Sequence, residues 1–527
     1  MELLIPDKIQ FDFDNYQNFI KRELASLKVK VEEFPEEYKD DESEKEKSVL
    51  DVFLESGIFP TYSFPKDVVG FYVEDQYGKK IEQKPERDLE IAISEYAPGR
   101  VIVINKTTYQ SGGIYSFHSK FRAGEYDHPA RRFFESKEYY KRLFYCDNPG
   151  CNWMGLEYHR ICPFCGKSTI NEQNMLTPWG FAPVNGAPIK EADADAEMTF
   201  ASSPCYSITP ADSEMKHPSG FAHLRYCKRS DDPLIILNKG NLNAGFMVCK
   251  DCGAAMPGDD ADVLKKVFKP FRHPYSKHPC FHPADRLVNT YLGNQFLTDL
   301  VVYEIEVDTN LINAETSGLW VTRAAQTLAE AMALAGGRLL DIEFNEIKSG
   351  YRLRYAQDQQ KAFIDIFLFD SLSSGAGYCA EIADRTKDLF TEAEQILSSC
   401  PNQCDCACHD CLMHYWNQRV HSLLDRYAAL DLLKWSQSAK LHESLAYEAQ
   451  AKLLAPLNSL SAEFSVIGDG NKHYLKTHNR KIDLIAYPAM WSETNSLLPR
   501  NAIAIPDRLL KYALPKVDEI IREIIGL

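Results

Sequence analysis

Four cysteines between residues 146 and 165 have the spacing of a zinc ribbon. Cys146 and Cys151 are separated by four residues, and after ten more residues Cys162 and Cys165 follow as a Cys-x2-Cys pair. Zinc takes four thiolate or imidazole ligands in a tetrahedron, which two short hairpin knuckles can supply. Gly166, directly after the second pair, permits the positive φ that turns backbone amides toward the sulfur atoms. We call these four residues the first cysteine cluster and predict that they hold zinc.

A second knuckle is formed by Cys249 and Cys252, followed by Gly253. Its remaining ligands must come from a later segment rich in cysteine and histidine. This segment offers Cys280, His273, His278 and His282. A site with three cysteines and one histidine is predicted, and the spacing alone leaves the choice of histidine open.

Five further cysteines lie between residues 400 and 411. Cys408 and Cys411 form a knuckle, Cys400 and Cys404 complete a tetrahedron, and Cys406 is the spare thiol. The third cysteine cluster is therefore Cys400, Cys404, Cys408 and Cys411. An iron–sulfur cluster is the chemical alternative, because thiolates also bind iron. Three closed sites predict about three zinc ions per chain with a structural rather than a catalytic role.

Basic residues beside the second knuckle are candidates for nucleic-acid contacts. They are Lys265, Lys266, Lys269 and Arg272, interleaved with Phe268 and Phe271. Cations can follow a phosphate backbone while aromatic rings stack on bases, although solvated surface charge is the alternative interpretation. Gly375 and Gly377 lie in a corner between a strand and a helix, where backbone amides can bind a phosphate. A plain tight turn is the alternative there. A further basic group comprises Lys472, Lys476, Arg480 and Lys481.

Composition restricts the class of protein. The 527 residues carry a net charge of −16 and include 15 cysteines. An acidic balance argues against unspecific coating of DNA. No apolar run approaches the roughly 18 residues that a membrane helix needs, and no export signal is evident. We therefore expect a cytoplasmic protein without a membrane association, whose thiols stay reduced.

The elements that must position these ligands mix strands and helices. A β unit is predicted over residues 87–117, where Leu89, Ile91 and Ile93 alternate. The apolar run at 362–369 predicts a strand buried on both faces. Further strands are predicted at 296–307 and 482–487, and helices at 324–335, 379–398, 415–439 and 509–525.

The sequence thus predicts an α+β fold of several domains, with inserted zinc ribbons and a cysteine-rich helical module. Residues 1–85 form an N-terminal helical and acidic segment, and residues 86–310 form a β-rich region. That region contains the two knuckle sites at about 146–165 and 249–282. Residues 311–440 form an α/β module with the third cysteine cluster, and residues 441–527 form a small α/β piece.

The segment 369–433 resembles the MrfA-type zinc-binding (MZB) domain of certain superfamily 2 DNA helicases and anti-phage defence proteins. The resemblance rests on Asp370, Gly375-Ala376-Gly377-Tyr378, Cys400, Cys404, Cys408-x2-Cys411-Leu412, Tyr415-x-Asn417-Gln418, His421 and Leu424-Asp425-Arg426. A weaker likeness extends upstream and includes Cys249, Cys252 and Gly253. This resemblance favours His273 as the histidine of the second site.

The resemblance implies a function, although motifs of a helicase motor are missing. Gly166-Lys167-Ser168-Thr169 imitates the end of a phosphate-binding loop, but Ile161 stands where that loop needs glycine. We expect a non-catalytic, zinc-binding, DNA-associated accessory subunit that partners a separately encoded superfamily 2 helicase. The setting would be DNA repair or anti-phage defence of the DISARM or Druantia type. A metal-dependent nuclease or hydrolase using Asp365 or Asp370, and a protein scaffold without nucleic acid, are the alternatives.

Overall fold

The computed structural model describes residues 68–75, 80–115, 130–148, 151, 153–190, 199, 201, 204–208, 210–258, 283–315, 319–355, 361–371, 375–460, 463–478 and 480–526. The chain divides into two units, Met1–Thr61 and Tyr62–Leu527, and the described residues all belong to the second unit. Several predicted residues lie outside this part of the chain. They are His273, Cys280, Lys265, Lys266, Lys269, Arg272 and most of the predicted segment 1–85.

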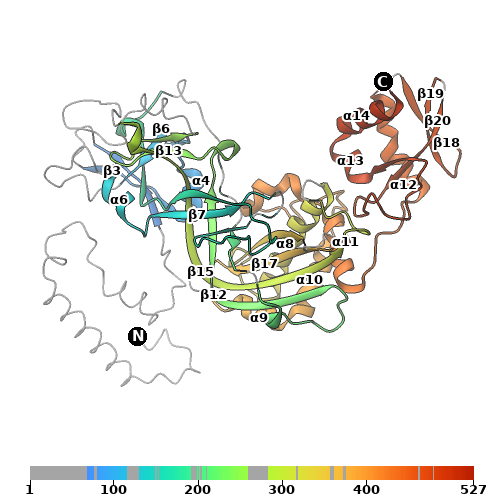
Figure 1. Cartoon of the computed structure of the whole chain (residues 1–527), viewed down its shortest axis with the longest axis horizontal. Helices are drawn as coiled ribbons and strands as arrows, with labels where there is room; N and C mark the ends of the chain where they lie inside the picture. The colour runs from blue at the N-terminus through green and yellow to red at the C-terminus, as the bar shows by residue number, and fades with distance from the viewer. Residues whose placement is uncertain are drawn as a thin grey trace. The chain divides into compact units, whose positions relative to one another are not determined.

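A long strand, β15 (Leu287–Asp308), organises the main sheet (Figure 1). It pairs antiparallel with β12 (Leu224–Asn238) on one side and with β17 (Lys361–Asp370) on the other. The predicted strand at 362–369 is confirmed as β17, in which Ile364 to Phe369 are buried. The sheet is therefore continuous between the regions before and after residue 310. Its other strands are β7 (Tyr140–Cys146), β8 (Met154–Gly155), β9 (Ile170–Leu176), β11 (Cys205–Tyr206), β13 (Phe246–Cys249), β14 (Ala255–Pro257) and β16 (Ile347–Tyr355).

Helices cover one face of this sheet. Helix α8 (Leu319–Leu340) is rich in alanine and packs between β16 and the helices α10 and α11. Its small side chains let these neighbours approach closely, and all but a few residues between Trp320 and Gly337 are buried. Figure 1 shows α8, α10 and α11 gathered beside β17. The other helices of this layer are α9 (Tyr378–Asp384), α10 (Thr386–Ser398) and α11 (Arg426–Ser438).

A smaller sheet combines strands from before and after the first cysteine cluster in the sequence. Its strands are β1 (Val68–Phe71), β4 (Glu86–Asp88), β5 (Val101–Ile104), β6 (Thr107–Ile114) and β10 (Gly180–Pro183), and β2 (Val73–Glu74) pairs with β3 (Ile81–Gln83) beside it. The prediction of a strand at Leu89–Ile93 was wrong, because these residues form helix α4 (Leu89–Glu95). Leu89, Ala92 and Ile93 are buried at helical spacing, which outweighs the alternation. The short helix α6 (Arg131–Glu135) follows.

The C-terminal piece has a sheet and a core of its own. Its four strands are β18 (Phe464–Gly468), β19 (His473–Thr477), β20 (Lys481–Tyr487) and β21 (Ile503–Pro506), in that order. One face is covered by α12 (Tyr447–Leu454), α13 (Asp507–Tyr512) and α14 (Leu514–Ile525), whose apolar side chains pack on Phe464, Leu475 and Leu484. The single terminal helix predicted at 509–525 is therefore two helices that break at Ala513.

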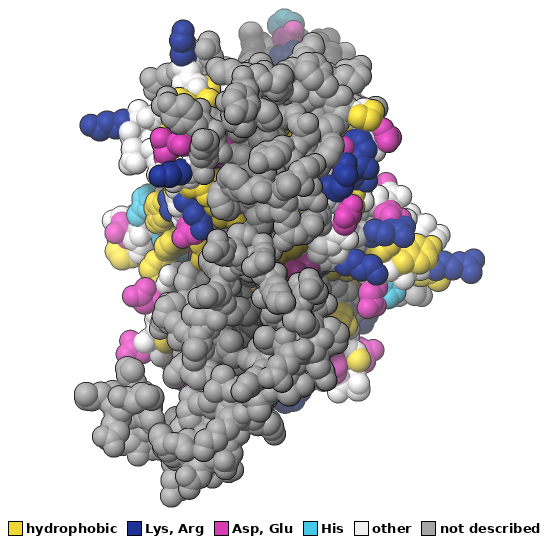
Figure 2. Space-filling view, turned by 90° about the vertical axis from the view of Figure 1, so that its left-hand side faces the viewer, with side chains coloured by type: hydrophobic (Ala, Val, Ile, Leu, Met, Phe, Trp, Pro, Cys, Tyr) yellow, Lys and Arg dark blue, Asp and Glu magenta, His cyan; other side chains and the backbone are white. Residues whose placement is uncertain are grey.

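The structure confirms the mixed α+β class with cysteine-rich segments. Short 3-10 turns complete the described elements: η2 (Val184–Gly186), η4 (Asp212–Glu214), η5 (Asn241–Asn243), η6 (Ala284–Arg286), η7 (Tyr415–Leu423) and η8 (Ala455–Ser459). Among the described residues, every helix is too short or too polar to cross a membrane. Figure 2 shows Lys and Arg side chains lying among Asp and Glu on the described surface of one face.

Candidate metal centres

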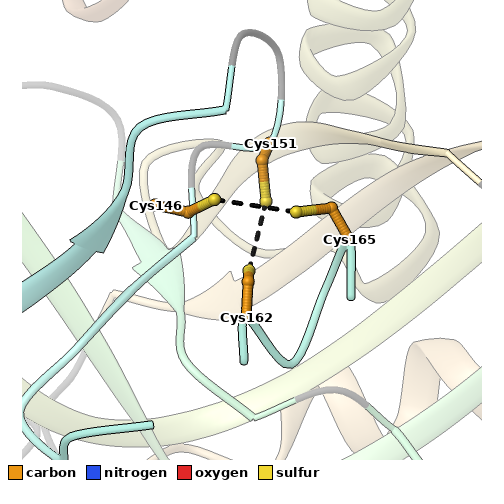
Figure 3. Close-up of side chains that lie close together, drawn as sticks. All are labelled: Cys146, Cys151, Cys162 and Cys165. Carbon is orange, nitrogen blue, oxygen red and sulfur yellow. Dashed lines mark hydrogen bonds between the residues drawn. The ribbon is translucent and has the colours of Figure 1, made fainter. Parts of the chain in front are cut away.

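The first cysteine cluster brings four sulfur atoms together from two turns (Figure 3). Cys146 ends β7, Cys151 follows in the next turn, and the second pair lies in the turn before β9. The Sγ atoms of Cys146 and Cys165 are 3.6 Å apart, and those of Cys151 and Cys162 are 3.5 Å apart. A zinc–sulfur bond of about 2.3 Å gives a tetrahedral edge of about 3.8 Å. The spacing of the four sulfur atoms therefore fits one zinc ion.

The environment of this cluster favours thiolates. The pKa of Cys162 is lowered to about 5, first because the Cys151 thiol donates to its sulfur and then because the amides of Cys165 and Phe164 do. The pKa of Cys151 is raised instead, because this thiol keeps the proton that it shares with Cys162 and because it is buried. A metal ion replaces that proton, since a bound thiol is deprotonated. The donor set is therefore suited to a cation.

The glycines that follow the knuckles have the predicted backbone conformation. Gly166 has φ +68° and Gly253 has φ +76°. A side chain at Gly253 would also place its Cβ 2.2 Å from the carbonyl oxygen of Ile114. Only glycine fits this close approach between the second knuckle and β6.

An aromatic side chain connects the first cysteine cluster to the main sheet. Phe164 lies between the two cysteines of the knuckle, and the guanidinium of Arg352 is 3.4 Å from the centre of its ring. The same guanidinium lies 4.0 Å from the centre of the Tyr206 ring. Arg352 and Arg354 both donate to Asp365, at 2.8 and 2.7 Å. The knuckle therefore rests on a buried ion pair of β16 and β17.

Asp365 is held as a carboxylate by these neighbours. Burial alone raises the pKa of a carboxyl group, but the charges of Arg354 and Arg352 outweigh it, so that the pKa of Asp365 is lowered. The hydroxyl of Tyr206 donates at 2.7 Å to Oδ2 of Asp365, the oxygen that also accepts from Arg352 and Arg354. Asp365 is completely buried and serves as the centre of a network within the sheet.

The third cysteine cluster gathers Cys400, Cys404, Cys408 and Cys411 after the end of α10. The Sγ atoms are 3.6 Å apart for Cys400 and Cys408, and 3.7 Å apart for Cys404 and Cys411. The pKa of Cys400 is lowered to about 6, first because the amide of Cys404 donates to its sulfur. These distances again fit the edges of a zinc tetrahedron.

Cys406 points away from this tetrahedron. Its Sγ lies 3.1 Å from the hydroxyl of Tyr512 in α13. The remaining cysteines assigned to no cluster, Cys205, Cys227 and Cys379, are buried.

The second knuckle is described only in part. Cys249 ends β13 and is fully buried, as is Cys252. Asp251 between them binds Arg286, with the shorter of the two hydrogen bonds at 2.6 Å, and Arg131 at 3.3 Å. These ion pairs fix the turn that presents both thiols. The ligand roles of His273 and Cys280 stay predictions, because both lie outside the described residues.

The amides of the glycine-rich corner are occupied by carboxylates. The amides of Ala376 and Cys379 donate to Asp370 at 2.6 and 2.9 Å, and that of Gly377 donates to Asp299 at 3.2 Å. Asp370 is completely buried. A role of Gly375 and Gly377 in phosphate binding stays a prediction, and in this structure the corner starts α9. Asp365 and Asp370, the two acids of the hydrolase alternative, are both enclosed by such contacts.

Several residues that support the third cysteine cluster were not predicted in these roles. The buried guanidinium of Arg426 donates to the carbonyl oxygens of Cys404 and Leu397 at 3.1 and 3.0 Å. Asp425 accepts hydrogen bonds from Arg508 at 2.9 Å and from Tyr512 at 2.8 Å. Asp425 and Arg426 belonged to the quoted motif, but nothing in their spacing indicates a partner about 80 residues later.

Two closed sets of four thiols on a mixed α and β framework define a protein with structural metal sites. Residues 328–412 match the model of the MrfA Zn-binding domain, abbreviated MZB. This stretch ends one residue after the last thiol of the third cysteine cluster. The predicted resemblance to the MrfA-type domain is thereby confirmed.

One relative aligns with most of the chain. The chain is 29% identical over 530 residues to the Druantia protein DruE of Escherichia coli (strain UMEA 4076-1). The alignment covers 93% of this chain and 28% of DruE. The chain therefore spans less than a third of the length of this relative.

Two crystal structures of the DUF1998 helicase MrfA show a weaker likeness. For the structure bound to DNA the TM-score is 0.34 at 12% identity, covering 72% of this chain and 35% of MrfA. For the structure bound to DNA and AMPPNP the TM-score is 0.25 at 9% identity, covering 69% and 32%.

Proposed function

We propose that this chain is a non-catalytic, zinc-stabilised module that binds DNA and acts with a superfamily 2 helicase in cytoplasmic defence against phage. The observation that carries the proposal is the likeness to DruE over 93% of the chain, together with the MZB match at 328–412. The likeness to DruE supports the defence setting, and the MZB match supports the zinc and helicase parts. DNA repair is the alternative setting.

In this proposal the motor is a separate polypeptide. The module contributes a rigid arrangement of surface turns rather than a chemical step. The first and third cysteine clusters, with zinc bound, would fix the turns that they connect. The ion pairs of Asp365 and Asp425 then hold these turns against the main sheet and the C-terminal piece.

Co-purification tests the partnership. The full chain carrying an affinity tag is expressed together with any superfamily 2 helicase that a neighbouring gene encodes. We expect the two to elute as one complex and the chain to change the rate of DNA-stimulated ATP hydrolysis by the helicase. Failure to form a complex would contradict the accessory role, and failure of the chain to bind any DNA at low salt would contradict the DNA association.

A variant of the third cysteine cluster provides the internal control. Cys408→Ser together with Cys411→Ser should lose one zinc ion and weaken the complex. Cys406→Ser keeps all four clustered thiols and should behave like the unchanged chain. Equal loss of binding in both variants would show that the cluster has no specific part in the partnership.

A further inference from the structure

Over β18, β19 and β20, the four-stranded sheet of the C-terminal piece has an open face that carries exposed or half-buried side chains, whereas Ala504 of β21 packs against the main core. Side chains alternate between the faces of a strand, so Leu475 of β19 and Leu484 of β20 point into the core with the helices. Tyr474, Lys476, Lys481 and Asp483 therefore lie on the opposite face. Figure 1 shows α13 and α14 to the left of β18, β19 and β20.

Cations are concentrated on this open face and on the turns at its ends. Lys476 and Lys481 are direct neighbours across β19 and β20, and Arg480 lies in the turn that joins the two strands. Like charges in directly opposite positions destabilise a sheet. Among the described residues, neither Lys476 nor Arg480 has a carboxylate partner. Both side chains are exposed.

The acidic groups nearby are already engaged. Asp483 binds Lys472 at 3.0 Å. Asp469 accepts the amides of Asn471 and Lys472 in the turn before β19, and the hydroxyl of Tyr474 at 2.7 Å. Because Asp469 caps this turn, it does not reach Lys476. The charges of Lys476 and Arg480 are thus left for a ligand, whereas Lys472 pairs with Asp483 and Lys481 lies within the field of Asp469.

Apolar surface accompanies these charges. The ring of Tyr474 lies at the middle of the face, with the ammonium group of Lys481 3.5 Å from its centre. Ile467 is the direct neighbour of Tyr474 on β18 and is 37% exposed. A flat ring, an aliphatic neighbour and cations on one open sheet match a ligand that presents planar bases along an anionic backbone. The bases of a duplex are stacked inside it and cannot reach such a face.

We propose that this face binds single-stranded nucleic acid, with Lys476 and Arg480 contacting phosphates and a base stacking on Tyr474 in place of the Lys481 ammonium, which turns to a phosphate. This proposal rests on the proposed function only in that both involve nucleic acid. The proposed function concerns the MZB module and its motor, whereas this face belongs to β18, β19 and β20 outside that module.

Binding of a labelled oligothymidylate of about 15 nucleotides to the full chain tests the proposal. Fluorescence anisotropy is measured at several salt concentrations. Lys476→Glu with Arg480→Glu should weaken binding about tenfold or more at low salt, and should reduce the slope of log affinity against log salt by about 1.4. Tyr474→Ala should weaken binding about fivefold or more.

A matched pair on the helical side is the control. Lys452→Glu with Lys516→Glu changes the net charge by the same amount, on exposed positions of α12 and α14. This variant should bind the oligonucleotide nearly as the unchanged chain does. Melting temperatures of all variants show whether the piece remains folded, and each binding loss counts only for variants that melt as the unchanged chain does.

Each result either supports or overturns the inference. An equal loss in both charge-reversal variants would overturn it, as would equally tight binding of a duplex of the same length or equal displacement by polyglutamate. If the unchanged chain binds the oligonucleotide and the hairpin variants bind it equally well, this inference alone fails. If the unchanged chain binds neither single strands nor duplex at low salt, the DNA part of the proposed function fails as well.

Discussion

Cys406 and Cys408 are two residues apart and have different surroundings. The sulfur of Cys408 lies 3.6 Å from that of Cys400, within a set of four thiols. The sulfur of Cys406 lies 3.1 Å from the hydroxyl of Tyr512 instead. In the loop 404–408, the side chains of Cys404 and Cys408 point toward the metal site, whereas that of Cys406 points toward Tyr512 in the C-terminal piece. Cys406 is therefore a natural control for the metal-binding role of its neighbours.

Replacement of single cysteines should distinguish these two thiols. Cys408→Ser removes one of four ligands, and a serine hydroxyl does not replace a thiolate on zinc, so we expect the zinc content to fall by about one ion per chain. Cys406→Ser should leave the zinc content unchanged. Elemental analysis of the purified variants by mass spectrometry measures both. Loss of metal from the Cys406 variant would mean that Cys406 replaces Cys400 or Cys404 as a ligand.

Arg352 should contribute strongly to stability, because it is buried between the knuckle of the first cysteine cluster and Asp365. Arg352→Ala removes a buried ion-pair partner, for which the expected loss is about 3 kcal/mol of the free energy of unfolding. Arg338→Ala is the matched control, because its pair with Glu392 is 60% and 27% exposed. That variant should lose about 0–1 kcal/mol. Urea denaturation measures both, and equal losses would contradict a special role of Arg352.

At the scale of elements, Asp425 explains why one predicted helix is two. The segment 415–439 forms η7 and then α11, because the carboxylate of Asp425 accepts the amides of Tyr427 and Ala428 and starts a new helix. The predicted helix at 379–398 is likewise α9 and α10, which break at Arg385. Apolar periodicity continues through both breaks, so the pattern alone indicated continuous helices.

Much of the fold was predictable where the signal was local. The apolar run of β17 and the alanine-rich α8 appear in the structure, and so do the four-thiol groupings, because knuckle spacing is set by short turns. Contacts between distant segments were not predictable. The pairing of Asp365 with Arg352 depends on the register of β16 and β17. The link from Asp425 to Arg508 depends on how the C-terminal piece docks.

Two variants of Asp425 should separate its helix cap from its ion pair. Burial raises the pKa of Asp425, but the charge of Arg508 and the hydroxyl of Tyr512 outweigh it, so the group stays ionised. Asp425→Asn retains an oxygen for the cap and loses the charge opposite Arg508, which should cost about 3 kcal/mol. Asp425→Ala should cost about 1 kcal/mol more, because the cap is lost as well. Urea denaturation measures these differences.

The comparison between the two variants is the informative part. If Asp425→Asn is as stable as the unchanged chain, the ion pair with Arg508 contributes nothing and the residue acts only as a cap. If both variants lose the same free energy, the cap contributes nothing.

At the scale of the whole molecule, the metal sites lie where segments distant in sequence meet. The first cysteine cluster contacts β16 through Arg352, about 190 residues later in the chain. The third contacts α13, where Lys511 donates to the carbonyl oxygen of Asp405 at 2.6 Å. By contrast, α8 and the strands below it are held by a continuous apolar core. Metal binding therefore adds to apolar packing at the two clusters, where Cys146, Cys151 and Cys162 belong to a core cluster and Cys411 packs against the core of α8, whereas α8 itself carries no cluster thiol.

Removal of metal should consequently loosen the described part of the chain unevenly. After treatment with a chelator, we expect backbone hydrogen exchange at residues 146–165 and 400–411 to rise about tenfold or more, because the turns lose the metal ion that ties their four thiols together. Exchange in α13 should rise less, since Asp425 still binds Arg508 and Tyr512. The amides of α8 should remain protected by their apolar neighbours. Mass spectrometry of peptides measures all four regions in one experiment. A uniform rise that includes α8 would show that the metal ions hold the entire fold, and no change at either cluster would contradict their role as zinc sites.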